Sequence, residues 1–178
     1  RKAEFYDFYR AKMLAPWAEP NAAHRKLAQW EQEGRLKAVI TQNIDGLHQK
    51  AGSREVLELH GSVLRNYCER CGAFYGLDTI LHSTGVPRCP ACGGDIKPDV
   101  VLYEESLDQE VLAKAVHYIR QADLMIIGGT SLVVYPAAGL VQYFRGRHLV
   151  VVNKGQVGSN VGADLTIDGP IGQVFSQL

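Results

Sequence analysis

Four cysteines have the residue type and spacing that most clearly predict chemistry in this chain. They form two CxxC pairs separated by seventeen residues, and they are Cys68, Cys71, Cys89 and Cys92. Each pair can bring two thiolates to one tetrahedral ion, and this spacing is characteristic of four-cysteine zinc sites. Four protein ligands leave no position for an activated water, so we expect a structural zinc ion rather than a catalytic one. Gly72 and Gly93 follow the pairs, where tight turns around sulfur need little steric bulk.

Other uses of these cysteines remain open at this point. A redox CxxC motif or free thiols are the simplest alternatives. A zinc ribbon can also bind nucleic acid, but that use normally requires a basic surface. Between positions 67 and 99 the basic residues are only Arg70, Arg88 and Lys97. We therefore favour a zinc module that supports the fold.

Three further segments combine polar side chains with glycine in a way that suits a ligand site. They are residues 41–48 (Thr-Gln-Asn-Ile-Asp-Gly-Leu-His), 58–62 (Glu-Leu-His-Gly-Ser) and 128–131 (Gly-Gly-Thr-Ser). The first could hydrogen-bond ribose hydroxyls and a carboxamide, and the third would let the backbone approach a phosphate closely. Each segment alone is a weak signal, because a lone histidine is more often structural and such a turn is more often only a turn.

Alternating helices and short apolar strands would position these segments. Residues 21–33 predict an amphipathic helix that starts at the N-cap Asn21 and stops at Gly34, and an apolar strand follows at 38–41. Later elements are a helix at 107–121, a strand at 123–129, a helix near 137–144, and strands at 149–152 and 163–167. Strands that are apolar on both faces and alternate with helices indicate right-handed crossovers and a parallel sheet.

This pattern predicts an α/β fold. We expect a Rossmann-like parallel sheet domain with helices on both faces, plus a small inserted zinc-ribbon module. The sheet domain would comprise residues 1–63 and 102–178, and the zinc module would comprise residues 64–101. The three polar segments then lie at the carboxyl ends of parallel strands, where open α/β sheets bind their ligands.

Composition excludes several classes of function. Nineteen basic and nineteen acidic residues cancel, so no long-range positive field attracts nucleic acid or a membrane surface. The apolar runs are far shorter than the roughly 20 residues that span a bilayer. The start of the chain lacks the pattern of a secretory signal, and CxxC pairs used as metal ligands favour a reducing, cytoplasmic location. The sequence gives no indication of oligomeric state.

The order of these motifs resembles the sirtuin family, the NAD-dependent protein deacylases. The resemblance runs from about Phe5 to the C-terminus and includes the three polar segments, both CxxC pairs and residues 20–24, 97–101 and 152–153. It implies a protein lysine deacetylase in which the acyl oxygen attacks NAD, nicotinamide leaves and the acyl group passes to ADP-ribose. A sirtuin-like ADP-ribosyltransferase and a non-catalytic zinc-ribbon or NAD-binding module are the alternatives.

The resemblance also assigns residues to roles. His60 would be the general base that acts on a ribose hydroxyl of NAD, the expected co-substrate, and an ordinary histidine pKa near neutral suits this role. The implied NAD contacts are Gln42, Asn43, Ile44, Asp45, Gly129, Thr130, Ser131, Asn153 and Asp164. An acetyl-lysine protein or peptide, the expected partner, would add as a strand beside Val100, Val101, Tyr103, Leu132 and Val133. His24 and His48 are interpreted as structural.

The chain departs from the family pattern in three respects. The family usually has glycine between an aromatic residue and a glutamate, where this chain has Tyr103-Glu104-Glu105. Members that remove succinyl groups carry arginine three residues after a tyrosine. Here Tyr6 is followed at that distance by Tyr9, which favours acetyl groups. The family's N-terminal glycine-rich segment is absent from the printed sequence, so we expect a native form with roughly 50 to 65 more residues.

Overall fold

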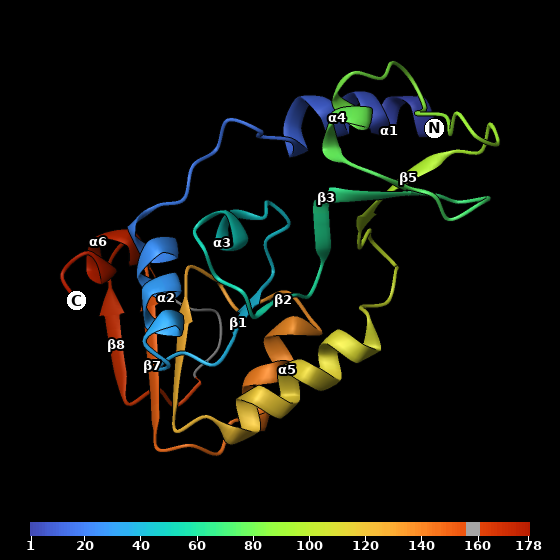
Figure 1. Ribbon diagram of the computed structural model, residues 1–178. Coiled ribbons are helices and arrows are strands. Elements are labelled where there is room, and N and C mark those ends of the chain that lie inside the picture. Colours follow the sequence, from blue (N-terminus) through green and yellow to red (C-terminus); the bar gives the residue numbers. More distant parts are fainter. Residues whose placement is uncertain (156–160) are drawn as a thin grey trace. The chain divides into compact units, whose positions relative to one another are not determined.

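The chain forms two compact units in a computed structural model that describes residues 1–155 and 161–178 (Figure 1). The zinc unit comprises Arg1–Ala18, Asn43–Gly46 and His60–Ser106, and the sheet unit comprises Glu19–Gln42, Leu47–Leu59 and Leu107–Leu178. The zinc unit is larger than the module expected at 64–101. The reason is packing, because Tyr9 and Leu14 are buried in the same hydrophobic cluster as Cys68.

The sheet unit contains two parallel sheets, which confirms the α/β prediction. Its strands are β1 (Val39–Thr41), β2 (Val56–Glu58), β6 (Leu124–Gly128), β7 (His148–Asn153) and β8 (Leu165–Asp168). Strand β1 pairs with β2, and the second sheet has the order β6-β7-β8. Its helices are α2 (Ala22–Gln32), α3 (Leu47–Lys50), α5 (Gln109–Gln121), the 3-10 helix η2 (Ala137–Tyr143) and α6 (Ile171–Phe175).

Strand β7 shows why the sheet needs cover on both faces. Its side chains alternate, so Leu149 and Val151 pack in a cluster with residues of η2. Val150 and Val152 face the other way and pack with residues of α2 and α6, including Phe175. A continuous apolar run is therefore the expected sequence of this strand, as predicted for 149–152.

Other predicted elements are confirmed with small differences. Asn21 caps α2, since its Oδ1 accepts from the backbone N–H groups of Ala23 at 2.9 Å and His24 at 3.2 Å. The His24 ring completes a capping box with Asn21, which supports its structural interpretation. Strand β6 is less buried than predicted: Leu124 is 50% exposed, because β6 is an outer strand of the described sheet.

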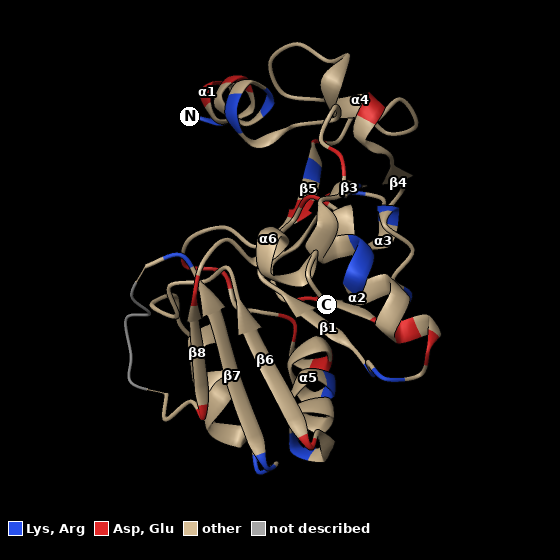
Figure 2. Ribbon diagram, turned by 90° about the vertical axis from the view of Figure 1, so that its left-hand side faces the viewer, with Lys and Arg blue, Asp and Glu red and all other residues tan. Residues whose placement is uncertain are grey.

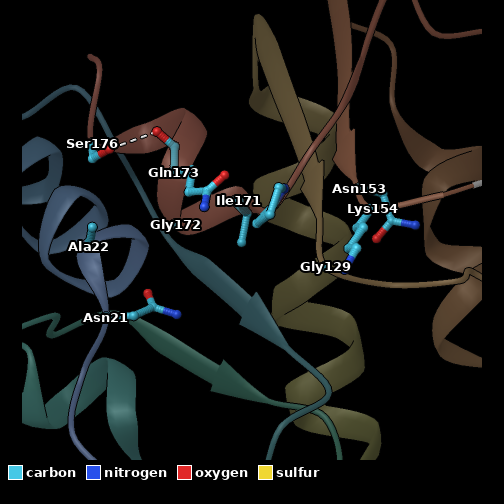
Figure 3. Close-up of a pocket in the computed structure, with 10 residues that line it drawn as sticks. Asn21, Ala22, Gly129, Asn153, Lys154, Ile171, Gly172, Gln173 and Ser176 are labelled. Carbon is cyan, nitrogen blue, oxygen red and sulfur yellow. Dashed lines mark hydrogen bonds between the residues drawn. The ribbon is translucent and has the colours of Figure 1, made fainter.

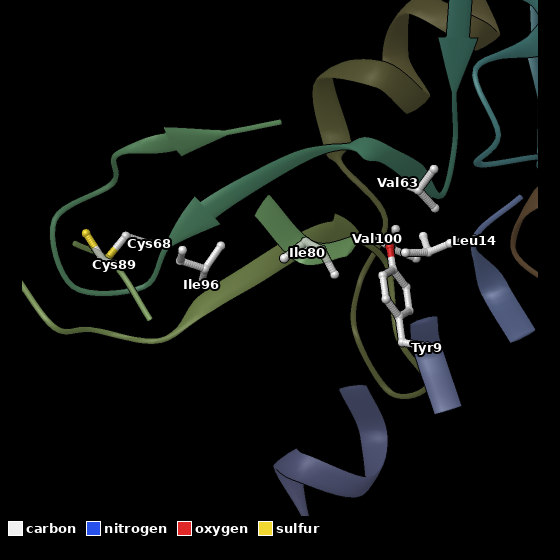
Figure 4. Packing of buried hydrophobic residues seen from close by; sticks show 8 residues of the cluster. All are labelled: Tyr9, Leu14, Val63, Cys68, Ile80, Cys89, Ile96 and Val100. Carbon is white, nitrogen blue, oxygen red and sulfur yellow. The ribbon is translucent and has the colours of Figure 1, made fainter. Parts of the chain in front are cut away.

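The zinc unit is built on an antiparallel sheet. Strand β3 (Gly61–Cys68) pairs with β4 (Phe74–Tyr75) on one side and β5 (Ile96–Val100) on the other. Helix α1 (Lys2–Phe8) continues into a π-helical turn, η1 (Tyr9–Met13), and α4 (Leu77–Leu81) follows β4. Figure 4 shows the core that joins them, formed by Tyr9, Leu14, Val63, Ile80, Ile96 and Val100 with Cys68 and Cys89.

Two surface properties bear on partners. No helix of the described residues is long and apolar enough to cross a membrane. Figure 2 shows Lys and Arg interspersed with Asp and Glu, for example on α5. This distribution agrees with the zero formal net charge of the chain.

Candidate functional site

The four cysteine sulfurs converge in the zinc unit and lie within 4.8 Å of one another. Cys68 Sγ is 3.4 Å from Cys92 Sγ, and Cys71 Sγ is 3.7 Å from Cys89 Sγ. Zinc–thiolate bonds of about 2.3 Å in a tetrahedron put neighbouring sulfurs about 3.8 Å apart. The donor set therefore fits one zinc ion held by four thiolates, as the spacing predicts.

Two matching turns position the sulfurs. Gly72 N–H donates to the Cys68 carbonyl at 2.9 Å, and Gly93 N–H donates to the Cys89 carbonyl at 2.8 Å. Both glycines have a φ of 71°, a left-handed conformation that other residues adopt only with strain. The predicted reason for these glycines, limited space around sulfur, is wrong, because a Cβ atom on either glycine would meet no atom within 4 Å. The left-handed backbone conformation is what favours glycine at both positions.

Tyr75 contacts the cysteine cluster, although no sequence motif identified it. Tyr75 lies on β4, and its hydroxyl is 2.9 Å from Sγ of Cys89, which follows α4 in the chain. This hydrogen bond is the main reason that the pKa of Cys89 is lowered to about 6. The same contact, with burial, raises the pKa of Tyr75 to about 12, so Tyr75 stays a hydrogen-bond donor at neutral pH. A donor of this kind stabilises a thiolate ligand.

The backbone of His60 is fixed beside the predicted peptide strand. His60 lies in the turn between β2 and β3, and its carbonyl oxygen accepts from Val101 N–H at 3.1 Å. A Cβ atom on Gly61 would lie 1.9 Å from the Asp99 carbonyl oxygen, so only glycine permits this close approach of β3 and β5. Two parts of the predicted site, His60 and residues 100–101, therefore belong to one rigid corner of the zinc unit.

The predicted NAD contacts at residues 42–45 divide between the units. Asn43, Ile44 and Asp45 belong to the zinc unit, where Val63 N–H donates to the Ile44 carbonyl at 2.9 Å. The Ile44 side chain also packs against the core of that unit. Gln42 directly follows β1 and belongs to the sheet unit. Three of these residues thus belong to the same unit as His60.

Strand β5 and the following turn carry the predicted peptide contacts of the zinc unit. Within the described residues, β5 pairs as a strand only with β3. At its second edge Ile96 N–H donates to the Pro87 carbonyl at 2.9 Å, and no named strand pairs with that edge from Pro98 to Val100. Pro98 lies in this strand, as expected for an edge position, because proline lacks the N–H group that a ladder needs. Tyr103, beyond the strand, is fully exposed. Of the two contacts predicted in the sheet unit, Leu132 is buried and Val133 is exposed.

A cavity of about 540 Å³ lies in the sheet unit at the carboxyl ends of β6 and β7 (Figure 3). Of the residues predicted to contact NAD, Gly129 and Asn153 line it, whereas Thr130 and Ser131 do not. Sequence reasoning missed the other lining residues, which are Asn21, Ala22, Lys154, Pro170, Ile171, Gly172, Gln173 and Ser176. Thr130 Oγ1 instead accepts from Leu132 N–H at 3.2 Å and shapes the turn after β6.

Asp164, another residue predicted to contact NAD, does not line this cavity. Its carboxylate accepts from Leu149 N–H at 2.7 Å, at the amino end of β7. Gly129 and Asn153 lie at the carboxyl end, because parallel strands have their carboxyl ends together. The acidic residue at that end is Asp168, which pairs in register with Asn153 and accepts from Gly155 N–H at 2.9 Å.

Known proteins resemble this chain over nearly its whole length. The Sir2 family model matches residues 1–136. The NAD-dependent protein deacetylase of Clostridium perfringens is 57% identical over 176 residues, which cover 98% of this chain and 72% of that protein. The NAD-dependent protein deacetylase of Staphylococcus aureus strain N315 is 40% identical over 174 residues, which cover 98% of this chain and 71% of that protein.

Solved structures give the same result. A structure of Sir2 with a p53 peptide and NAD⁺ has a TM-score of 0.90 and 42% identity, and the match covers 98% of this chain and 75% of that one. A structure of Sir2 bound to an acetylated peptide has a TM-score of 0.90 and 41% identity, with 98% and 76% covered. The cysteine cluster, the His60 corner and these matches together identify this chain as a member of the Sir2 family.

Proposed function

We infer that the chain is an NAD-dependent protein lysine deacetylase, which transfers the acetyl group of acetyl-lysine to ADP-ribose and releases nicotinamide. Relatives named as NAD-dependent protein deacetylases match 98% of the chain, and similar Sir2 structures hold an acetylated peptide or a peptide with NAD⁺. The observation in this structure that best supports the proposal is the hydrogen bond from Val101 to His60. It joins the candidate base to the candidate peptide strand.

His60 acts in this proposal as the base that removes a proton from a ribose hydroxyl. Imidazole is suited to this step because its ordinary pKa lies near the working pH. NAD supplies the electrophilic ribose carbon and the hydroxyl that accepts the acetyl group. Asn43 and Asp45 orient the nicotinamide ribose and the carboxamide, Ile44 packs on the nicotinamide, and Gln42 contacts the ribose.

The adenosine half of NAD binds in the cavity of the sheet unit. Gly129 leaves room for a close approach of the backbone, and Asn153 offers an amide to a hydroxyl. Thr130 and Ser131 contribute through the turn that follows β6. The residues that line this cavity belong to α2, β7, α6 and the turns beside them, so its walls are part of the packed fold.

The acetylated peptide adds as a strand to the open edge of β5 at Val100 and Val101. Backbone pairing gives affinity in this binding mode, and side chains near the strand give specificity. Tyr103, Leu132 and Val133 flank the bound peptide.

The zinc ion is structural and holds β3 and β5 in place without touching substrate. We also propose a cytoplasmic location, where the four thiols stay reduced and available to zinc.

The test measures nicotinamide release with NAD and an acetyl-lysine peptide, together with the mass of the peptide. We expect release that depends on both compounds and a peptide that loses one acetyl group. His60→Ala should abolish both signals, whereas the control His117→Ala on the exposed face of α5 should retain them. Release without deacetylation, accompanied by an acid-stable ADP-ribosyl label on protein, would instead support an ADP-ribosyltransferase.

A further inference from the structure

The turn after β5 contains two adjacent glutamates with different surroundings. Glu105 closes the turn: its N–H donates to the Leu102 carbonyl at 3.1 Å, and its Oε2 accepts from Leu102 N–H at 2.9 Å. Its Oε1 lies 3.1 Å from Lys97 Nζ. Both oxygens of Glu105 are therefore engaged inside the zinc unit. Glu104 is exposed, and no hydrogen bond or ion pair joins its side chain to any residue that the structure describes.

The charges along β5 and its turn leave one carboxylate unbalanced. Lys97 pairs with Glu105, and Asp99 pairs with Arg65 at 2.7 Å. These two pairs are each neutral, so the single uncompensated charge between positions 96 and 105 is that of Glu104. It lies beyond the end of β5, where no described strand pairs with the second edge of β5 from Pro98 to Val100.

The backbone holds Glu104 in a fixed and unusual conformation. Its φ is 71°, in the left-handed region where glycine is favoured and where other residues are uncommon. The neighbouring Tyr103 is fully exposed, so this side of the turn is open. A charged residue in a conformation that disfavours it, on an open turn beside a strand edge, is suited to contact a ligand of opposite charge.

We propose that Glu104 selects acetyl-lysine substrates that carry a basic side chain, arginine or a second lysine, near the acetylated residue. This inference rests on the proposed function, in which the peptide pairs with β5. A peptide strand has side chains at fixed intervals, so the carboxylate reaches one flanking position and not the others. The contact is exposed to solvent, which limits it to about two- to fivefold in affinity and makes it weaken with salt.

The experiment compares peptides that differ at one flanking position, with arginine, glutamine or glutamate there, each position being tested in turn. Binding to the zinc-loaded protein is measured by fluorescence anisotropy, and deacetylation is measured in parallel. The readout is the ratio of affinities for the arginine and glutamine peptides within each protein variant. We expect this ratio to be about two- to fivefold at one position for the unmodified protein, and to approach one at high salt.

Two substitutions of Glu104 and one control variant test whether the Glu104 carboxylate causes the difference in affinity. Glu104→Gln keeps the backbone strain and removes the charge, and Glu104→Gly removes both, so both should bring the ratio to about one. Glu110→Gln removes an equal charge from α5 and should leave the ratio unchanged. A ratio near one in the unmodified protein, or an unchanged ratio in Glu104→Gln, overturns the proposal. Selective binding without deacetylation would contradict the proposed function and leave the role of Glu104 supported. If no peptide binds, both proposals fail.

Discussion

Tyr75 is the residue outside the four ligands that we expect to matter most for zinc. Its hydroxyl donates to Cys89 Sγ at 2.9 Å, and loss of such a donor to a metal ligand typically costs about 10- to 100-fold in metal affinity. Tyr75→Phe should therefore lose zinc to a competing chelator at correspondingly lower chelator concentration. Tyr67→Phe, which changes an exposed ring on β3, is the matched control. Equal zinc retention in the two variants would mean that the hydrogen bond contributes nothing.

Two tyrosines on the N-terminal helical segment should respond in opposite ways to loss of the hydroxyl. Tyr6 is buried and donates to the Ile96 carbonyl, whereas the buried Tyr9 hydroxyl has no partner among the described residues. A buried hydroxyl without a partner costs about 1 kcal/mol or more, and a satisfied one contributes about 1 kcal/mol. Tyr9→Phe should raise the free energy of unfolding, and Tyr6→Phe should lower it, in denaturant titrations of the zinc-loaded protein. A loss of stability in Tyr9→Phe would show that its hydroxyl has a partner in solution.

Residues that act through local sequence could be predicted, and those that act through distant contacts could not. The CxxC spacing and the glycines after it fix a turn within a few residues, so the metal ligands were predictable. Tyr75 and Asp168 depend on how strands pair, and no motif reports this. Asp164 is predicted as an NAD contact from the family resemblance alone, and its place at the amino end of β7 depends on strand pairing, which no motif reports.

At the scale of elements, the stability of the turn at residues 102–105 should depend on the Glu105 side chain. This contribution to stability should not change with pH near neutrality. The N–H of Leu102 lowers the pKa of the Glu105 carboxyl below its ordinary value of 4.5, with help from Lys97. A lowered pKa means that the stabilisation is fully present above the ordinary value and is lost only as the pH falls through the lowered one.

Glu105→Ala should accordingly lower the free energy of unfolding by up to about 1 kcal/mol, since the contact is partly exposed. The loss should be constant between about pH 6 and about pH 8, because the carboxyl is ionised throughout that range. Denaturant titrations of both proteins at several pH values measure it. A loss that shrinks between pH 8 and pH 6 would mean that another titrating group, and not the Glu105 carboxyl, controls the turn.

The pattern of apolar residues along the sequence predicted a strand correctly where both faces of that strand are covered by helices. Strand β7 is apolar on successive residues because α2 and α6 cover one face and η2 covers the other. Strand β6 has the same kind of sequence but is half exposed at Leu124, since a run of apolar residues does not reveal which strand lies at an edge. The helix expected near 137–144 is a 3-10 helix, and its sequence differs little from that of an α-helix.

At the scale of the whole molecule, the position of a residue in the sequence does not show which of the two units it belongs to. Residues 1–18 were expected in the sheet domain because they precede its first strand. They belong to the zinc unit because Tyr9 and Leu14 fill its core and Lys2 pairs with Asp95 at 2.5 Å. Sequence distance between Lys2 and Asp95 gives no sign of this contact. Removal of zinc should therefore affect the N-terminal helical segment as well as the strands that carry the cysteines.

The two units should respond differently to a strong chelator. Cys68 and Cys89 are 2% exposed and belong to the zinc-unit core, so that core depends on the metal, whereas the clusters around Val151 and Val152 in the sheet unit contain no ligand. Structural zinc contributes about 10 to 16 kcal/mol of apparent binding energy, which exceeds the stability of most small domains. Hydrogen exchange should then rise in α1, β3 and β5 while β7 stays protected. Zinc, but not magnesium, should restore protection. Simultaneous loss in β7 would mean that the units unfold as one, because chelation would then reach residues whose packing does not involve the metal.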